Sequence, residues 1–302
     1  MKGDILLLFA LFASVIVSCE HKDYPNLIVA EEDLIVLDTI WKINNTLDNS
    51  CKYKNEVFSG QGMAILNDTL YRLFHSGVCI ASDISGLEAP KTLFTTELGS
   101  RIESNHCNCA QFDYPSLGEG LLYVSSVKEL NGERGECYVE RVCGEKAELI
   151  QTISIENVGI LDNYKGVNII CGDDGLLWIF GYNIQGTKII VAKARKPSIS
   201  EGFKVLLTDS DIIDYWFDSD LSYKISVSQG GTIHNGYLYF VFGSRTGYKH
   251  IVVYNTATHQ KVGNIELNDC VYEEPEDCCF KGDTLLVSIY GGKGYYALLL
   301  KQ

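Results

Sequence analysis

Residues 225–268 read ISVSQGGTIHNGYLYFVFGSRTGYKHIVVYNTATHQKVGNIELN. The stretch contains four apolar runs between turn signals: Ser226–Ile233, Tyr237–Gly243, His250–Asn255 and Lys261–Leu267. Asn235-Gly236 is the dipeptide that supplies the two positive-φ residues of a tight hairpin. β-Branched and aromatic residues dominate the runs, as they do in strands. Four short antiparallel strands in about 44 residues are typical of one blade of a β-propeller.

The same pattern recurs along the chain. SGQGMAILNDTLYRLF at 59–74 matches VSQGGTIHNGYLYFVF at 227–242, and the glutamine and the leucine of each copy are equally spaced. Weaker copies complete a set of five units, whose second strands are marked by leucines 47–61 residues apart: Leu70, Leu122, Leu177, Leu238 and Leu285. The last unit has three clear strands, and Asp33–Asn44 supplies a fourth. The sequence therefore predicts an all-β, five-bladed propeller over residues 32–302, closed into a ring by its N-terminal strand.

Two details of this prediction depend on the region after the third unit. We expect Gly202–Leu207 to be the fourth strand of that unit. The acidic segment 210–223 (SDIIDYWFDSDLSY) is then an insertion, or a degenerate extra unit that would make six blades. No stretch has the 3.6-residue apolar period of a helix, so we expect low helix content.

The N-terminus has the features of a targeting segment. Lys2 precedes an apolar run, Ile5–Val17, that is too short to cross a bilayer stably. The run ends at Ser18-Cys19, which predicts a lipoprotein signal peptide over residues 1–18, lipidation of Cys19 and a flexible tether over residues 19–31. The alternative is an ordinary secretory signal with an incidental cysteine. A lipid on Cys19 would attach the protein to a membrane without a transmembrane helix.

Charge and cysteine content restrict the partners. The formal net charge of −14 argues against nucleic acid and against direct adhesion to anionic lipid headgroups. Export permits disulfides among the eleven cysteines, but a domain of this size does not need them, so we expect mostly buried thiols. Cys137–Cys143 is the most plausible local bridge. The Cys107-Asn108-Cys109 pair lacks a second pair at zinc-finger spacing, so the sequence predicts no metal site and no cofactor.

In a propeller, the segments that lead into the innermost strands meet at one mouth of the axis, which is the default ligand site. Here they carry amides, a histidine, a tyrosine and a lysine, which favour a hydroxyl-rich ligand. The candidate ligand-binding residues are Gln61, His106, Asn108, Tyr164, Lys165 and Gln229, with Trp216 as an exposed stacking platform. The alternative for the two glutamines is that they satisfy neighbouring backbone groups.

Glu274 and Glu276, together with His106, are candidate catalytic residues. Glycoside hydrolysis needs two carboxyl groups on either side of the scissile bond. These two glutamates come from one predicted blade, and no obvious aspartate faces them from the first. The chain also has no Gly-x-Ser-x-Gly elbow, no phosphate-binding glycine loop and no His-Glu-x-x-His motif. The sequence therefore favours binding over catalysis.

The blade phrases QGG…NGYLYFVFG…YNTATHQ and EPE…GDTLLVSIYGG, together with the segment ending at Cys19, resemble the extracytoplasmic β-propeller lipoproteins of Bacteroidetes. The resemblance covers most of residues 55–302 and transfers no catalytic residue. It implies an outer-membrane lipoprotein that faces the periplasm or the cell surface. We expect a binding module for carbohydrate or glycan fragments. The alternatives are a glycan-cleaving hydrolase or lyase and a protein-interaction scaffold.

Overall fold

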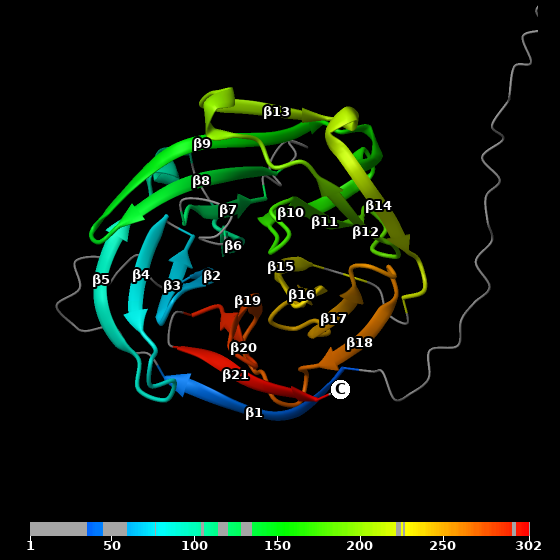
Figure 1. Ribbon diagram of the computed structural model, residues 1–302. Coiled ribbons are helices and arrows are strands. Elements are labelled where there is room, and N and C mark those ends of the chain that lie inside the picture. The colour runs from blue at the N-terminus through cyan, green and yellow to red at the C-terminus, as the bar shows by residue number, and fades with distance from the viewer. Residues whose placement is uncertain are drawn as a thin grey trace, which may run out of the picture.

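The computed structural model describes residues 35–44, 59–75, 77–103, 106–113, 120–127, 135–221, 225, 227–291 and 294–301. These residues form five sheets arranged as the blades of a propeller around a central axis (Figure 1). The predicted all-β, five-bladed fold is confirmed. The predicted signal peptide, the tether and Cys19 lie outside the described residues.

The first three strands of each blade form an antiparallel meander that starts at the axis, and a fourth antiparallel strand follows toward the rim. Blade 1 contains β2 (Gly60–Leu66), β3 (Thr69–Phe74), β4 (Val78–Asp83) and β5 (Lys91–Glu97). Blade 2 begins with β6 (Cys109–Phe112), β7 (Leu122–Ser126), β8 (Glu136–Cys143) and β9 (Lys146–Asn157). Blade 3 contains β10 (Tyr164–Cys171), β11 (Leu177–Asn183), β12 (Ile189–Ala194) and β14 (Ile212–Asp218). Blade 4 contains β15 (Ser228–His234), β16 (Tyr237–Phe242), β17 (His250–Asn255) and β18 (Lys261–Glu266).

Blade 5 joins the two ends of the described chain. Its first three strands are β19 (Pro275–Lys281), β20 (Thr284–Ile289) and β21 (Gly294–Lys301), and β1 (Val36–Asn44) is its outermost strand. β1 pairs antiparallel with β21 over its whole length. The predicted closure of the ring by the N-terminal strand is therefore confirmed, and it covers an edge of β21 that would otherwise be open.

One strand departs from the prediction. Gly202–Leu207 was expected to complete blade 3, but β13 (Lys204–Thr208) pairs in parallel with β9 and becomes a fifth strand of blade 2. The fourth strand of blade 3 is β14, which lies inside the acidic segment 210–223 and pairs with β12. The segment thus completes an existing blade, and the six-bladed alternative is wrong.

The core lies between neighbouring sheets, because the middle strands of each blade are covered on both faces. β11 and β16 are buried along almost their whole length, which explains their unbroken apolar sequences. The described cysteines are all free, and most of them are buried, as expected. The predicted Cys137–Cys143 bridge is wrong: both residues lie on β8, where Cys137 pairs with Ile153 and Cys143 with Lys146, near opposite ends of the strand.

Candidate functional site

The propeller axis has two ends with different chemistry. At the mouth end, the chain leads into the innermost strands β2, β6, β10, β15 and β19; at the turn end, these strands turn back into the second strands of their blades. The sequence predicted a ligand site at the mouth end. Each end has a cavity or cleft.

Four of the predicted residues form a buried polar layer at the mouth end. Gln61, Gln229 and Glu276 each lie within a β-bulge of an innermost strand, and Asn108 directly precedes β6. Their exposed fractions are only 3–7%. The Gln229 Nε2 atom donates to the backbone oxygen of Gly243 at 2.9 Å and to Glu274 Oε1 at 3.0 Å. These amides therefore close the axis instead of lining an open pocket.

Asp277 lies next to this layer and joins three blades. Its Oδ2 atom accepts hydrogen bonds from the backbone N–H of Met63 at 2.9 Å and of Ala110 at 3.0 Å, so one carboxyl group of blade 5 holds blades 1 and 2. Blade 4 approaches just as closely: a Cβ atom at Gly230 would lie 2.1 Å from Asp277 Oδ1. Only glycine permits this contact.

Burial raises the pKa values of the acids at this end. Burial, followed by the negative charges of Glu274 and Asp277, raises the pKa of Glu276 to about 9. Burial also raises the pKa of Asp277 to about 8, against the opposing effect of its backbone hydrogen bonds, and raises that of Glu274. All three acids belong to blade 5 or to the segment that leads into it. This is not the arrangement of facing carboxyl groups from two blades that a glycosidase uses.

His106 does not join this acid cluster. Its ring packs edge-on against His75, with 4.3 Å between the centroids. Burial, and then the neighbouring His75, lowers the pKa of His106 to about 4, so it is neutral at physiological pH. No described interaction joins His106 to Glu274 or Glu276, so the predicted acid–base set is not brought together.

The remaining predicted residues lie on blade 3. The Tyr164 ring stacks on Phe217 with 6.0 Å between the centroids, and Lys165 Nζ lies 5.0 Å from the centroid of the Tyr182 ring. Trp216 was predicted to be an exposed platform, but it is only 8% exposed and stacks on His259 at 4.3 Å. That prediction is wrong.

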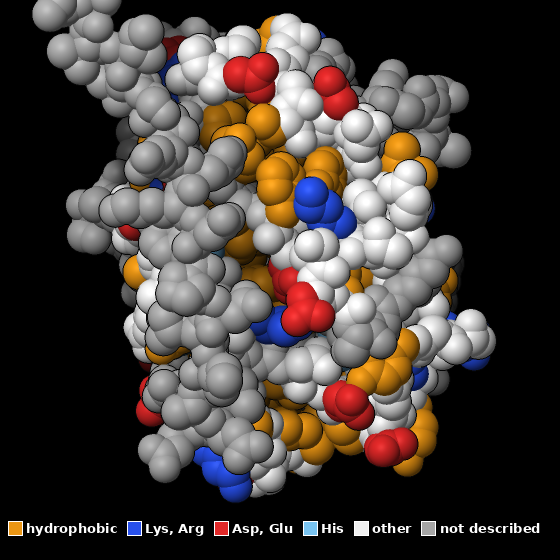
Figure 2. All heavy atoms as spheres, turned by 90° about the vertical axis from the view of Figure 1, so that its right-hand side faces the viewer, with side chains coloured by type: hydrophobic (Ala, Val, Ile, Leu, Met, Phe, Trp, Pro, Cys, Tyr) orange, Lys and Arg blue, Asp and Glu red, His pale blue; other side chains and the backbone are white. Residues whose placement is uncertain are grey.

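The opposite face of β14 is the exposed one. Ile213, Tyr215 and Phe217 alternate with Trp216 along the strand and are 41–57% exposed. Figure 2 shows the side of the molecule on which β14 and β18 lie, where hydrophobic side chains reach the surface between charged ones.

A cleft at the rim of the mouth end lies between blades 4 and 5. Its volume is about 400 Å³. It is lined by Arg245, Tyr272, Glu273, Glu274, Ile289, Tyr290 and Gly291. Two of these are exposed aromatic residues, Tyr272 at 78% and Tyr290 at 45%. We call this feature the rim cleft. Glu274 connects it to the buried layer through its hydrogen bond with Gln229.

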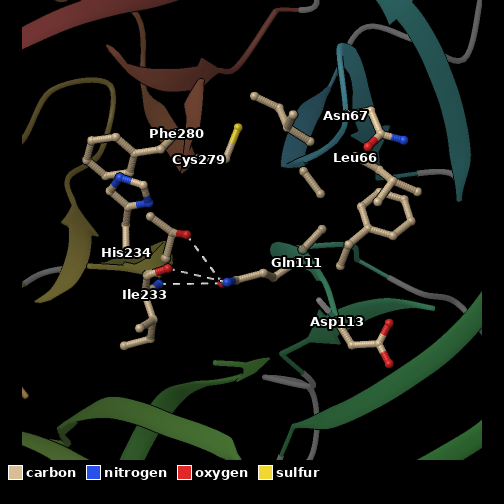
Figure 3. Close-up of a pocket in the computed structure, with 13 residues that line it drawn as sticks. Leu66, Asn67, Gln111, Asp113, Ile233, His234, Cys279 and Phe280 are labelled. Atoms are coloured by element: carbon tan, nitrogen blue, oxygen red, sulfur yellow. Dashed lines mark hydrogen bonds between the residues drawn. The ribbon is translucent and has the colours of Figure 1, made fainter. Parts of the chain in front are cut away.

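The turn end has a cavity of about 300 Å³ on the axis, lined by residues of four blades (Figure 3). Gln111 crosses it from blade 2 to blade 4: its Oε1 atom accepts from Thr232 Oγ1 at 3.3 Å, and its Nε2 atom donates to the backbone oxygen of Ile233 at 3.4 Å. Beside this contact, the His234 ring of blade 4 stacks on Phe280 of blade 5, with 4.0 Å between the centroids and 11° between the planes. We call this the turn-end cavity.

Neither the aromatic side of the rim cleft nor the turn-end cavity was predicted from the sequence. Tyr272 lies only two positions before Glu274, so its proximity to the predicted acids was a usable signal. The residues of the turn-end cavity lie next to the first turn of each repeat, as His234 precedes Asn235-Gly236. These residues come together only because the ring closes, so no local sequence motif reveals the cavity.

The described residues contain neither a metal-binding cluster nor a membrane-spanning helix. No three histidine, cysteine, aspartate or glutamate side chains in the described part of the chain gather closely enough to hold a metal ion. No helix in that part has the length and apolarity needed to cross a bilayer.

The chain matches no protein-family model and no curated protein. Among solved structures, it is similar to the glutaminyl cyclase of Myxococcus xanthus, with a TM-score of 0.52 and 12% identity over 88% of this chain and 97% of that one. It is also similar to the exo-β-1,3-galactanase 1,3Gal43A of Clostridium thermocellum, with a TM-score of 0.52 and 12% identity over 86% of this chain and 62% of that one. A DUF4623 family protein of Bacteroides eggerthii gives a TM-score of 0.41 and 12% identity over 88% of this chain and 76% of that one. At these identities, the likeness to the glutaminyl cyclase and the galactanase concerns the propeller fold alone.

Proposed function

We propose that this protein is a lipid-anchored binding module of the bacterial cell envelope that recognises a carbohydrate or glycan fragment in the rim cleft. The observation that carries the proposal is the pairing of two exposed tyrosines, Tyr272 and Tyr290, with the polar side chains of Glu274 and Arg245 in one cleft. Aromatic faces stack on the apolar faces of sugar rings, and adjacent charged groups hydrogen-bond to hydroxyls.

The setting of Glu274 also suits a hydroxyl-rich ligand. Burial raises its pKa, and the hydrogen bonds from the Gln229 side chain and the Arg245 backbone, followed by the charges of Lys249 and Arg245, oppose the shift. Carboxyl oxygens accept hydrogen bonds from sugar hydroxyls. The hydrogen bond with the buried Gln229 fixes the orientation of this carboxyl group at the cleft.

Binding fits this geometry better than hydrolysis. The carboxyl groups whose charges raise the pKa of Glu276 belong to Glu274 and Asp277. All three acids lie within four consecutive residues of the sequence. Hydrolysis requires acid and base on opposite sides of a scissile bond. The hydrolase or lyase alternative is therefore an outcome to be tested, and we do not propose it.

A protein-interaction scaffold is the second candidate function. The row of Ile213, Tyr215 and Phe217 on β14 favours it, because an exposed apolar strand at the rim of a blade suits a protein partner. The row lies on blade 3, whereas the rim cleft lies between blades 4 and 5, so separate variants can test the two functions.

The proposed location rests on the N-terminal sequence. Lipidation of Cys19 would hold the propeller at the outer membrane, facing the periplasm or the cell surface. Metabolic labelling with a fatty acid should mark the wild-type protein and not the Cys19→Ala variant. Persistent labelling of that variant would remove the lipoprotein assignment and leave the binding site unaffected.

The binding proposal is tested by titrating the purified protein with neutral oligosaccharides in a calorimeter. We expect Tyr272→Ala and Tyr290→Ala each to raise the Kd about tenfold, equivalent to about 1.4 kcal/mol. Tyr215→Ala, which removes an exposed tyrosine of blade 3, is the matched control and should bind normally. If His234→Ala abolishes binding instead, the ligand occupies the turn-end cavity and the rim cleft is wrong. Release of reducing ends by the wild type and not by Glu276→Gln would establish the hydrolase.

A further inference from the structure

A buried cation lies in the interface between blades 5 and 1, where the ring closes. Arg72 extends from β3 of blade 1 and is 1% exposed. Its Nη2 atom donates to the backbone oxygen of Gly294 on β21 at 3.0 Å. The Nε and Nη1 atoms of the same guanidinium are buried and have no hydrogen-bond partner among the described residues. Three of the five N–H donors of this side chain are thus unsatisfied.

Among the described residues, no carboxylate forms an ion pair with Arg72. Its neighbours are aromatic: the guanidinium carbon lies 5.5 Å from the ring centroid of Phe74 and 5.9 Å from that of Tyr295. Burial lowers the pKa of Arg72 to about 10, so the side chain remains a cation at neutral pH. Cation–π contacts offset part of the desolvation cost, but a fully buried ion without a counter-charge is strongly destabilising.

Two further donors with unmet hydrogen-bonding capacity face the same interface. Tyr295 Oη and Trp41 Nε1 are buried and have no hydrogen-bond partner in the described part of the chain. In the β1–β21 pairing, Tyr295 is opposite Ile43, and Trp41 is opposite Ala297, so both side chains lie on the face that packs against blade 1. The interface therefore contains a cation and several unpartnered donors, and no acidic side chain of the described residues pairs with them.

We propose that this interface binds a small inorganic anion of the chloride class, held by Arg72 Nε and Nη1 and by the Tyr295 hydroxyl. A monatomic anion is the ligand that both neutralises the guanidinium and accepts hydrogen bonds from donors on several sides. Arg72 and Tyr295 are buried between the sheets of blades 1 and 5, which favours a small anion over a larger one. Because the anion contacts β3 and β21 together, it stabilises the closed ring.

The proposal predicts a chloride-dependent stability. Thermal unfolding of the full protein is measured while sodium chloride replaces sodium methanesulfonate at constant ionic strength. We expect Tm to rise by roughly 2–4 °C when the chloride concentration reaches about ten times the Kd. Arg72→Met should remove this dependence, whatever its own Tm, and Tyr295→Phe should weaken it. Tyr239→Phe, in the interface between blades 4 and 5, is the matched control and should respond as the wild type does.

A direct measurement guards against a variant that fails to fold. Crystals of the wild-type protein soaked in sodium bromide should give an anomalous peak in contact with Arg72 Nε or Nη1. A flat chloride titration of the wild type, or water alone at this position in the bromide-soaked crystal, would overturn the proposal. Neither result bears on glycan binding in the rim cleft, which is tested separately.

Discussion

The two ends of the propeller axis are built from the same five strands and differ in what occupies the axis. At the mouth end, the glycines allow very close contact: a Cβ atom at Gly62 would lie 2.6 Å from the backbone oxygen of Cys107. The space that remains is filled by buried amides and acids. At the turn end, a cavity of about 300 Å³ persists between four blades. The acids with strongly raised pKa values lie at the closed end of the axis. Acids with shifted pKa values therefore do not by themselves mark an open binding site.

The largest expected difference between the ends is in stability. Asp277→Ala leaves the backbone N–H groups of Met63 and Ala110 buried without acceptors, at a cost of about 2–6 kcal/mol in the free energy of unfolding. Asp113 at the turn end accepts from one backbone N–H, of Leu121 at 2.6 Å, so Asp113→Ala should cost about 1–3 kcal/mol. Urea denaturation measures both. Equal losses would contradict the idea that Asp277 holds the ring at its closed end.

The second difference is in pH dependence. The pKa of Glu276 is about 9 in the folded protein and near 4.5 in the unfolded chain, so between these values the folded state holds a proton that the unfolded state has lost. Stability therefore falls as pH rises through this window, with a slope of about 1.4 kcal/mol per pH unit from this group alone. From pH 7 to 8, Glu276→Gln should flatten the stability curve by about that amount.

Glu145→Gln, at an exposed position, is the control for this experiment and should leave the slope unchanged. The pKa values of His106 and His250 are lowered to about 4 and about 3 from an ordinary value of 6.5. These two groups make stability rise with pH below about 6.5, and the interval from pH 7 to 8 avoids that range. An unchanged slope in Glu276→Gln would mean that this carboxyl group is hydrated, and that the mouth end is open.

The smallest effect is expected at the turn end. His234→Ala removes the ring that stacks on Phe280, which should cost about 0.5–1.5 kcal/mol. The same change enlarges the cavity beside Gln111. Urea denaturation gives the stability, and a crystal structure of the variant gives the cavity. If the loss approaches that of Asp277→Ala, the turn end contributes to ring closure as much as the mouth end does.

The blade count and the ring closure could be predicted because each blade repeats a local pattern of short apolar strands and turn residues. Asn235-Gly236 and its counterpart Asn67-Asp68 mark equivalent turns, and the strand at Asp33–Asn44 had no other partner. The assignment of β13 failed because its partner, β9, is distant in the sequence and the apolar run is compatible with either blade. Only the packing of two adjacent sheets decides between them.

The exposure of individual side chains was harder to predict. In β14, Trp216 shares a face with Asp214 and Asp218, whereas Ile213, Tyr215 and Phe217 form a wholly apolar face. The alternation therefore favours burial of the wrong face, and Trp216 was predicted to be exposed although it is buried. Gln61 and Gln229 were identified correctly as residues of the mouth end. Their burial depends on how closely the innermost strands approach one another, which no single strand encodes. The same limit hid the rim cleft, since Arg245 and Tyr290 belong to loops of different blades.

The position of β13 has a consequence for the order in which the chain can fold. Blade 2 is complete only after the first three strands of blade 3 have been synthesised, because β13 follows β12 in the sequence and pairs with β9. β1, in turn, has no partner until β21, the last strand, has been made. A blade can thus contain a strand that is separated from its other strands in the sequence by strands of other blades. We expect the ring to unfold as one cooperative unit, and a chain truncated before β21 to leave β1 unpaired and prone to pair with other chains.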